Sequence, residues 1–307
     1  MKSIAFVVVF LLLFVPQGGW AKKVVKNCPE TLRLDAIPPR PGDAITGSEF
    51  AKRTSCMSGE DRQKAALEEI KRGNVPSFLR TLKPLDVSDY AEDGKYYTVL
   101  IWVSPDYLAI GSDKDFLRIP LTLPSATAIA NDLGCILPTK KIVNEIYKNS
   151  SIQLKPQPLP PGPQMRSSGY FLKHQNMIEK QRAGCPSGEL TSGHKKDIVL
   201  TNRLLNRPDR IAIYGWHKLD GEPIQPLSTV HGARYADYSH GVRLIWSTVW
   251  INGEPRSIYE VLQNSNLASL LTYEGVIEKS WALMHRQYQP THLLASGSRV
   301  LQHRNPK

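Results

Sequence analysis

The sequence lacks the short motifs that identify many enzymes. It has no Walker loop, no Gly-x-Gly-x-x-Gly after a predicted strand and no His-Glu-x-x-His; these motifs bind nucleotide phosphates or zinc. We therefore expect no nucleotide-dependent enzyme. Only four of the 307 residues are cysteines, and none of them forms a Cys-x-x-Cys pair, so neither a cysteine-based zinc site nor a redox dithiol is indicated.

Long apolar runs are missing after the first 21 residues, and those residues are typical of a secretory signal peptide. Lys2 precedes the apolar stretch Ile4 to Val15, and Gly19-Trp20-Ala21 offers small residues for cleavage. The stretch is shorter than the roughly 20 residues that cross a bilayer. We predict a secreted or periplasmic protein with no stable membrane span after cleavage; the alternative is an uncleaved anchor.

Export makes disulfides the default for the cysteines, since oxidising compartments favour them. Proximity in sequence favours the pairs Cys28–Cys56 and Cys135–Cys185, although four cysteines allow three pairings. The alternative for Cys135 is a free, reactive thiol. It lies close to predicted helix starts, where unpaired N–H groups lower the pKa of a thiol.

The net charge of +11 is unevenly distributed. Residues 22–132 hold equal numbers of basic and acidic residues, whereas residues 134–307 hold nearly all of the basic excess. The cations are dispersed and the leader predicts export, so we expect no nucleic acid as partner. An anionic polymer or glycan of the cell envelope is the predicted partner. The oligomeric state is left open.

Strand and helix patterns alternate irregularly, which predicts an α+β fold with mixed, mainly antiparallel strands and short helices after an irregular N-terminal segment. Tyr97 to Val103 is the strongest strand, Asp61 to Arg72 is an amphipathic helix, and Asn252-Gly253 predicts a hairpin turn. The predicted parts are a signal peptide (1–21), an irregular and helical lead-in (22–95), a first α+β part (96–154), a Pro-rich connector (155–164), a His-rich α+β part (165–289) and a loose tail (290–307).

Four of the eight histidines fall between residues 194 and 240, close to carboxylates, aromatic residues and cations. Histidine titrates near neutral pH and a nearby carboxylate raises its basicity, so this grouping predicts acid–base chemistry. The predicted catalytic residues are His194, His231, Asp237 and His240, with Cys135 as the candidate nucleophile. The predicted substrate-binding residues are Lys196, Trp216, Tyr235 and Arg243. The alternative is that the histidines are scattered and individually hydrogen-bonded.

Zinc is the one cofactor that these residues suggest. Three protein ligands and a water are common at a catalytic zinc site, and His194, His231 and His240 are the candidate ligands.

His231-Gly232 followed by Ser239-His240-Gly241-Val242-Arg243 resembles part of the signature of the L,D-transpeptidases of bacterial cell walls. In that family a cysteine follows the second His-Gly and attacks a peptidoglycan stem peptide. Val242 stands at that position here, so the resemblance implies a related frame without the family's nucleophile. The order of Cys135 and a later histidine, His194, is similar to papain-like cell-wall peptidases of the NlpC/P60 type, without their Asp-Cys-Ser-Gly motif.

Three stretches, Gly73 to Leu79, Pro105 to Asp113 and residues 193–244, resemble secreted bacterial proteins that have no assigned activity. That resemblance implies export and leaves the reaction open. Together these features predict an exported hydrolase or transferase that acts on peptidoglycan-like material. The alternative is a non-enzymatic module that binds the envelope or a glycan.

Overall fold

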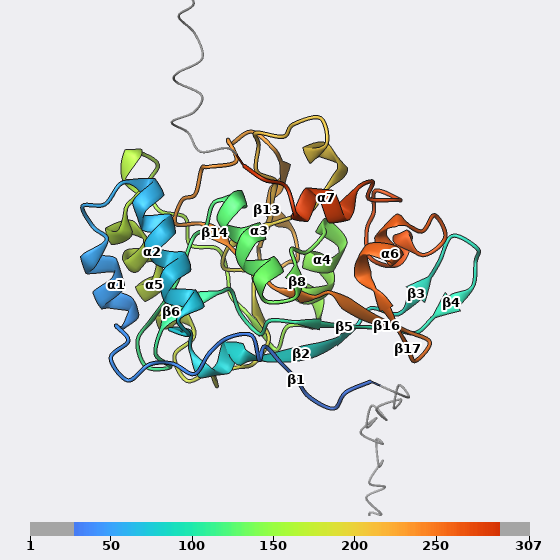
Figure 1. Cartoon of the computed structure of the whole chain (residues 1–307), viewed down its shortest axis with the longest axis horizontal. Helices are drawn as coiled ribbons and strands as arrows, with labels where there is room; N and C mark the ends of the chain where they lie inside the picture. Colours follow the sequence, from blue (N-terminus) through green and yellow to red (C-terminus); the bar gives the residue numbers. More distant parts are fainter. Residues whose placement is uncertain (1–27, 289–307) are drawn as a thin grey trace, which may run out of the picture.

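Two sheets carry most of the β-structure in residues 28–288, the part of the chain that the computed structural model describes (Figure 1). Their strands are mainly antiparallel and short helices pack around them, so the predicted α+β class is confirmed. The predicted signal peptide and the whole of the predicted tail (290–307) lie outside the described residues.

The larger sheet has seven strands, and its centre is β5 (Val99–Val103). This strand reads Val-Leu-Ile-Trp-Val, and four of its five side chains are buried, as β-branched and aromatic residues favour. The main path of the sheet also contains β1 (Leu32–Arg33), β2 (Thr81–Asp86), β15 (Ile245–Trp246) and β8 (Cys135–Ile136), in the order β1-β2-β5-β15-β8. The lead-in and both predicted α+β parts therefore contribute strands to one sheet.

A hairpin completes this sheet beside β5. Strand β16 (Thr248–Ile251) pairs with β5 and with β17 (Glu254–Ser257). Asn252 and Gly253 form the turn with positive φ angles of 51° and 88°, which is the geometry that an Asn-Gly turn adopts. The predicted hairpin turn is confirmed.

The smaller sheet has four strands, and it carries three of the predicted site residues, Lys196, Trp216 and His240. Its order is β13 (Pro223–Ser228), β12 (Ile213–His217), β11 (Lys196–Ile198) and β14 (His240–Gly241). Strands β11 and β14 run parallel, with Lys196 opposite His240 and Asp197 opposite Gly241. This register places residues that are far apart in the sequence side by side.

Seven α-helices lie within the described residues: α1 (Gly47–Arg53), α2 (Gly59–Lys71), α3 (Leu123–Asp132), α4 (Lys140–Asn149), α5 (Ser168–Gln181), α6 (Ile258–Gln263) and α7 (Ser280–Met284). Five of them begin after a Ser or Thr whose hydroxyl accepts an N–H of the first turn, which satisfies an otherwise unpaired donor. Helices α1, α2 and α5 gather at one end of the molecule, on the left in Figure 1. None of the helices in residues 28–288 has the length and apolar character needed to cross a membrane.

Three separate pairs of short strands complete the β-structure: β3 (Asp89–Tyr90) with β4 (Tyr96–Tyr97), β6 (Ala109–Gly111) with β7 (Phe116–Arg118), and β9 (Ile152–Gln153) with β10 (Thr191–Ser192). The Pro-rich segment 155–164 follows β9 and packs against the loop before β14. The Leu159 N–H donates to the Tyr238 hydroxyl at 2.7 Å. This contact fixes the proline-rich segment next to the predicted site.

We expect Gly241→Ala to destabilise the protein by about 1–3 kcal/mol, because overpacking a dense core forces side chains from their positions. A Cβ at Gly241 meets the buried Tyr107 ring at 2.4 Å. Gly169→Ala is the control, since Gly169 lies in α5 with open space around its Cβ position; it is expected to be neutral or slightly stabilising. Urea unfolding measures both, and equal stabilities of the two variants contradict the prediction.

Candidate functional site

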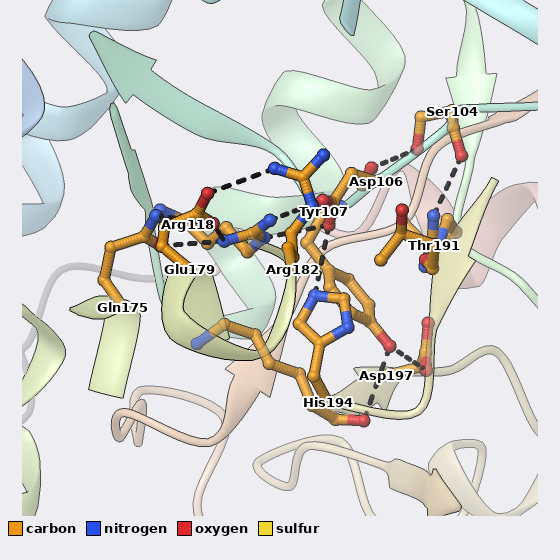
Figure 2. Close-up of polar contacts among 12 residues, drawn as sticks. Ser104, Asp106, Tyr107, Arg118, Gln175, Glu179, Arg182, Thr191, His194 and Asp197 are labelled. Atoms are coloured by element: carbon orange, nitrogen blue, oxygen red, sulfur yellow. Dashed lines mark hydrogen bonds and ion pairs between the residues drawn. The ribbon is translucent and has the colours of Figure 1, made fainter. Parts of the chain in front are cut away.

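Six buried side chains form a continuous polar group, which we call the inner network: Asp106, Tyr107, Arg118, His194, Asp197 and Arg243 (Figure 2). They come from the loop after β5, from β7, from the residues before and within β11, and from the segment after β14. Figure 2 shows how their labelled members face one another, with Tyr107 between Asp106 and Asp197.

The ion pair between Arg118 and Asp106 is the strongest contact of the inner network. Arg118 donates through Nε and Nη2 to the two Asp106 oxygens at 3.0 and 2.6 Å. Its Nη1 donates to Glu179 at 2.6 Å and to Gln175 at 3.1 Å, both on α5. Burial favours the neutral acid, but Arg118 and His194 hold the pKa of Asp106 well below its usual range, so the carboxylate is ionised.

His194 lies against the same carboxylate. Its Nε2 is 3.2 Å from Asp106 Oδ1, and its ring packs edge-on against Tyr107 at 4.9 Å. Burial lowers the pKa of His194 to about 4, although Asp106 opposes this change. The imidazole is therefore neutral at pH 7, with its Nδ1 buried and without a partner among the described residues.

Tyr107, Asp197 and Arg243 form the other half of the inner network. The Tyr107 hydroxyl donates to Asp197 Oδ2 at 2.8 Å, and burial raises the pKa of Asp197 to about 6 although Arg243 opposes it. The Arg243 guanidinium lies 4.3 Å from the Tyr107 ring centre and donates to the backbone carbonyls of Ser104 and Thr191. Arg243 is fully buried, so it joins three chain segments inside the protein.

A second group lies nearer the surface, and we call it the outer cluster: Lys196, His231, Tyr235, Asp237, Ser239 and His240. Asp237 is its centre, with Oδ2 accepting from the Tyr235 hydroxyl at 2.9 Å and Oδ1 accepting from the Ser239 hydroxyl at 2.6 Å. The rings of His231 and Tyr235 stack 4.2 Å apart. His231, Tyr235 and Lys196 are only partly buried, so this cluster reaches solvent.

The outer cluster combines an ionised carboxylate with neutral imidazoles. Burial opposes ionisation of Asp237, but His240, the hydrogen bonds from Ser239 and the charge of Lys196 lower its pKa. Burial lowers the pKa of His240 to about 4 and also lowers the pKa of His231, in both cases against the effect of Asp237. The two rings are 6.3 Å apart, and neither nitrogen of His240 has a partner among the described residues. A neutral imidazole can accept a proton and a nearby carboxylate stabilises the cation.

Two buried residues lie between the two groups. The Lys195 ammonium donates to the Tyr238 carbonyl at 2.6 Å, and burial together with the charge of Arg118 lowers its pKa to about 7. Trp216 on β12 is 4% exposed and has a positive φ of 58°. Its ring lies under the Lys196 ammonium at 5.1 Å. Trp216, which the sequence predicted to bind substrate, thus lies inside the protein.

The structure therefore divides the predicted site residues. His231, Asp237, His240, Tyr235 and Lys196 come together in the outer cluster, with Trp216 directly below Lys196. His194 and Arg243 belong to the inner network instead.

Cys135 lies apart from both groups, on β8 at the edge of the seven-stranded sheet. Its thiol contacts the Leu133 carbonyl at 3.5 Å, and burial raises its pKa. The expected lowering of this pKa is wrong because α4 begins only at Lys140, after its cap Thr139. All four cysteines are free in the described part of the chain, and the two disulfides remain predictions.

The zinc hypothesis gains no support from the geometry. Within residues 28–288, no three His, Cys, Asp or Glu side chains are arranged so that they could hold a metal ion. His194 belongs to the inner network, whereas His231 and His240 belong to the outer cluster. We therefore assign no metal ligand.

The sequence did not predict Asp106 and Arg118, although they form the buried ion pair of the inner network. Asp106 follows the strongest strand in a Ser-Pro-Asp-Tyr turn, and this position after a strand was the one available signal. Arg118 lies in β7 among apolar residues and is 1% exposed. A buried arginine requires hydrogen-bond acceptors for its guanidinium, but the sequence does not show that Asp106 is one of them.

Comparisons with known proteins add no assignment. No family model, no curated protein and no solved structure matches the chain. The candidate function consequently rests on the chemistry of the two groups.

The buried histidines predict loss of stability in acid. Burial lowers the pKa of His174 to about 2 and that of His217 to about 4, as for His194 and His240. Between pH 6.5 and 4 the unfolded chain binds more protons than the folded one, so the free energy of unfolding falls as the pH falls, by up to about 1.4 kcal/mol per pH unit for each histidine. Asp197, with its raised pKa, offsets part of this change below pH 6.

His174→Phe tests this origin directly. His174 is fully buried between the rings of Trp216 and Tyr238, and neither of its nitrogens has a partner among the described residues. The variant is expected to reduce the pH slope of the unfolding free energy by about one proton. His285→Phe is the control, since His285 is exposed beside Trp281. An unchanged slope in His174→Phe contradicts the assignment.

Asp106→Asn is expected to destabilise the protein by about 3–5 kcal/mol, because it leaves the buried Arg118 without its main counter-charge. Asp220→Asn is the matched control. It removes the carboxylate of an exposed ion pair with Lys218, and no measurable change is expected. Chemical unfolding at pH 7 compares the two, and a similar stability of both variants argues against the role of the buried pair.

Proposed function

We propose that the protein is an exported hydrolase or transferase that acts on peptidoglycan-like material of the cell envelope. The observation that carries this proposal is the outer cluster, in which His231 and His240 lie beside the ionised Asp237 at a solvent-accessible edge. Perturbed histidines and a carboxylate that share one place are typical of catalytic sites.

The two histidines have different places in the proposed reaction. His231 is partly exposed and can contact a substrate, whereas His240 is fully buried behind it. We assign the first proton transfer to His231, since a neutral imidazole accepts a proton at pH 7. Asp237 stabilises the imidazolium that forms and holds Tyr235 through the hydrogen bond at 2.9 Å. His194 has its own carboxylate, Asp106, and takes no part in this step.

Positive charge around the cluster suits an anionic substrate. Lys196 lies over Trp216, and the Arg166 guanidinium lies 5.5 Å from the centre of the Tyr235 ring. Cations next to a polar cleft attract carboxylates and phosphates, which are abundant on envelope polymers. Secretion or periplasmic location is part of this proposal, because the predicted signal peptide lies outside the described residues.

The second candidate is a non-enzymatic module that binds an envelope glycan. The partly buried Tyr235, with cations beside it, favours this alternative. Aromatic rings and charges at a surface can hold a sugar polymer without any proton transfer.

Incubation with purified sacculi, followed by chromatography of the released fragments, tests the proposal. We expect the wild-type protein to release or rearrange fragments. His231→Gln is expected to lose about 100-fold or more in rate, since general acid–base catalysis contributes that much. His240→Gln, which alters the buried ring behind His231, is expected to slow the reaction to a smaller extent. His285→Gln is the control because His285 is exposed and lies beside Trp281. Co-sedimentation with the same sacculi measures binding in each variant.

The alternative has a distinct outcome. Binding to sacculi without released fragments, unchanged in His240→Gln, supports the binding module and rejects the enzyme. Fragment release at the wild-type rate in both histidine variants rejects the assigned residues.

A further inference from the structure

A pocket of about 440 Å³ lies between the starts of α2 and α3 and the loop that carries the outer cluster. We call it the arginine pocket, and the residues that matter for it are Arg62, Arg166, Arg234, Thr122, Ser125 and Ala236. Arg234 and Ala236 alternate in sequence with Tyr235 and Asp237. The two sites are therefore neighbours on one loop.

Arg62 is the most constrained cation of the arginine pocket. It belongs to α2, is only 7% exposed and lies 5.2 Å from the centre of the Phe171 ring. Its Nη2 donates to the Arg166 carbonyl, while its buried Nε has no partner among the described residues. No carboxylate in the described part of the chain pairs with Arg62, in contrast to the buried Arg118. A buried guanidinium with an unused donor is a costly arrangement unless something else pairs with it.

Arg166 adds a second charge at the rim. It ends the short helical turn η2 (Pro163–Arg166), is exposed, and lies over the Tyr235 ring at 5.5 Å. Within residues 28–288 it has no ion-pair partner either. Burial, and after it the charge of Arg166, lowers the pKa of Arg62, because like charges disfavour the charged form.

The remaining lining residues do not neutralise this charge. Glu60 also lines the pocket, but the Lys64 ammonium lies 3.4 Å from its carboxylate. The first turns of α2 and α3 add the positive ends of two helix dipoles. Guanidinium groups and helix N-termini are the groups that bind oxyanions in proteins.

We propose that the arginine pocket binds an oxyanion, as a phosphate or a carboxylate group of a larger ligand. Arg62 provides buried guanidinium donors, and Arg166 provides a second guanidinium at the rim. Arg234 lines the side of the pocket that faces the outer cluster. An anion bound here places the rest of its ligand next to His231 and Tyr235. The proposal stands whether or not the outer cluster is catalytic, because it concerns binding alone.

Calorimetric titration of the full chain with inorganic phosphate, and separately with acetate, tests the pocket at constant ionic strength maintained with chloride. We expect saturable binding of at least one anion to the wild-type protein. Arg166→Gln and Arg62→Gln are each expected to weaken it about tenfold or more. Arg256→Gln is the matched control, because it removes the same charge from an exposed position on β17.

The possible outcomes distinguish the two ligand classes and show whether the proposal holds. Tighter binding of phosphate assigns a phosphoryl ligand, and tighter binding of acetate assigns a carboxylate. Absence of saturable binding by both anions overturns the proposal, as does binding that Arg166→Gln leaves unchanged. Since Arg166 is exposed, its variant keeps the fold and gives this answer even if Arg62→Gln fails to fold.

Discussion

The buried ion pair between Asp106 and Arg118 is the constraint on which the arrangement of both sites depends. Removing two charges from water is costly unless every donor and acceptor is satisfied. The Asp106 carboxylate meets this condition by accepting hydrogen bonds from the Arg118 guanidinium and the Tyr107 N–H, and it lies next to the Nε2 atom of His194. Those contacts join the end of β5, strand β7 and the residues before β11. The same arginine also reaches Glu179 on α5, so four segments meet at one point.

That junction fixes the outer cluster indirectly. Once His194 is held against Asp106, strand β11 begins at a set position, and its parallel pairing places His240 opposite Lys196. The two polar groups then differ in one physical respect. In the inner network His194 has one ring nitrogen against Asp106 and one without a partner, whereas both buried nitrogens of His240 in the outer cluster lack a partner among the described residues. Paired charges stabilise a fold, and spare hydrogen-bonding capacity beside an ionised carboxylate is what proton transfer requires.

Local patterns in the sequence predicted much of the fold and only part of the site. The capped helices, the apolar strand β5 and the Asn252-Gly253 turn follow from neighbouring residues. Most of the outer cluster could be predicted from the sequence for the same reason, since His231 to His240 is one loop and one strand. Asp106 and Arg118 were not, because their pairing exists only after β6 and β7 fold back on the loop. Cys135 was predicted to lie near a helix start, but it belongs to the short strand β8, and α4 begins only at Lys140.

The arginine pocket differs from the general basic excess of the sequence. Net charge over a long segment describes solubility and long-range attraction, not a site. A site requires cations that are confined and not neutralised by the protein itself. Arg118 is confined, but it pairs with the carboxylates of Asp106 and Glu179. The buried Arg243 lies near the Asp197 carboxylate and donates to two backbone carbonyls. Arg62 is nearly as buried, lies beside a second guanidinium and keeps an unused donor. In the proposed binding mode an anion neutralises these charges, so we expect the ligand of the pocket and the neighbouring outer cluster to carry an anionic group.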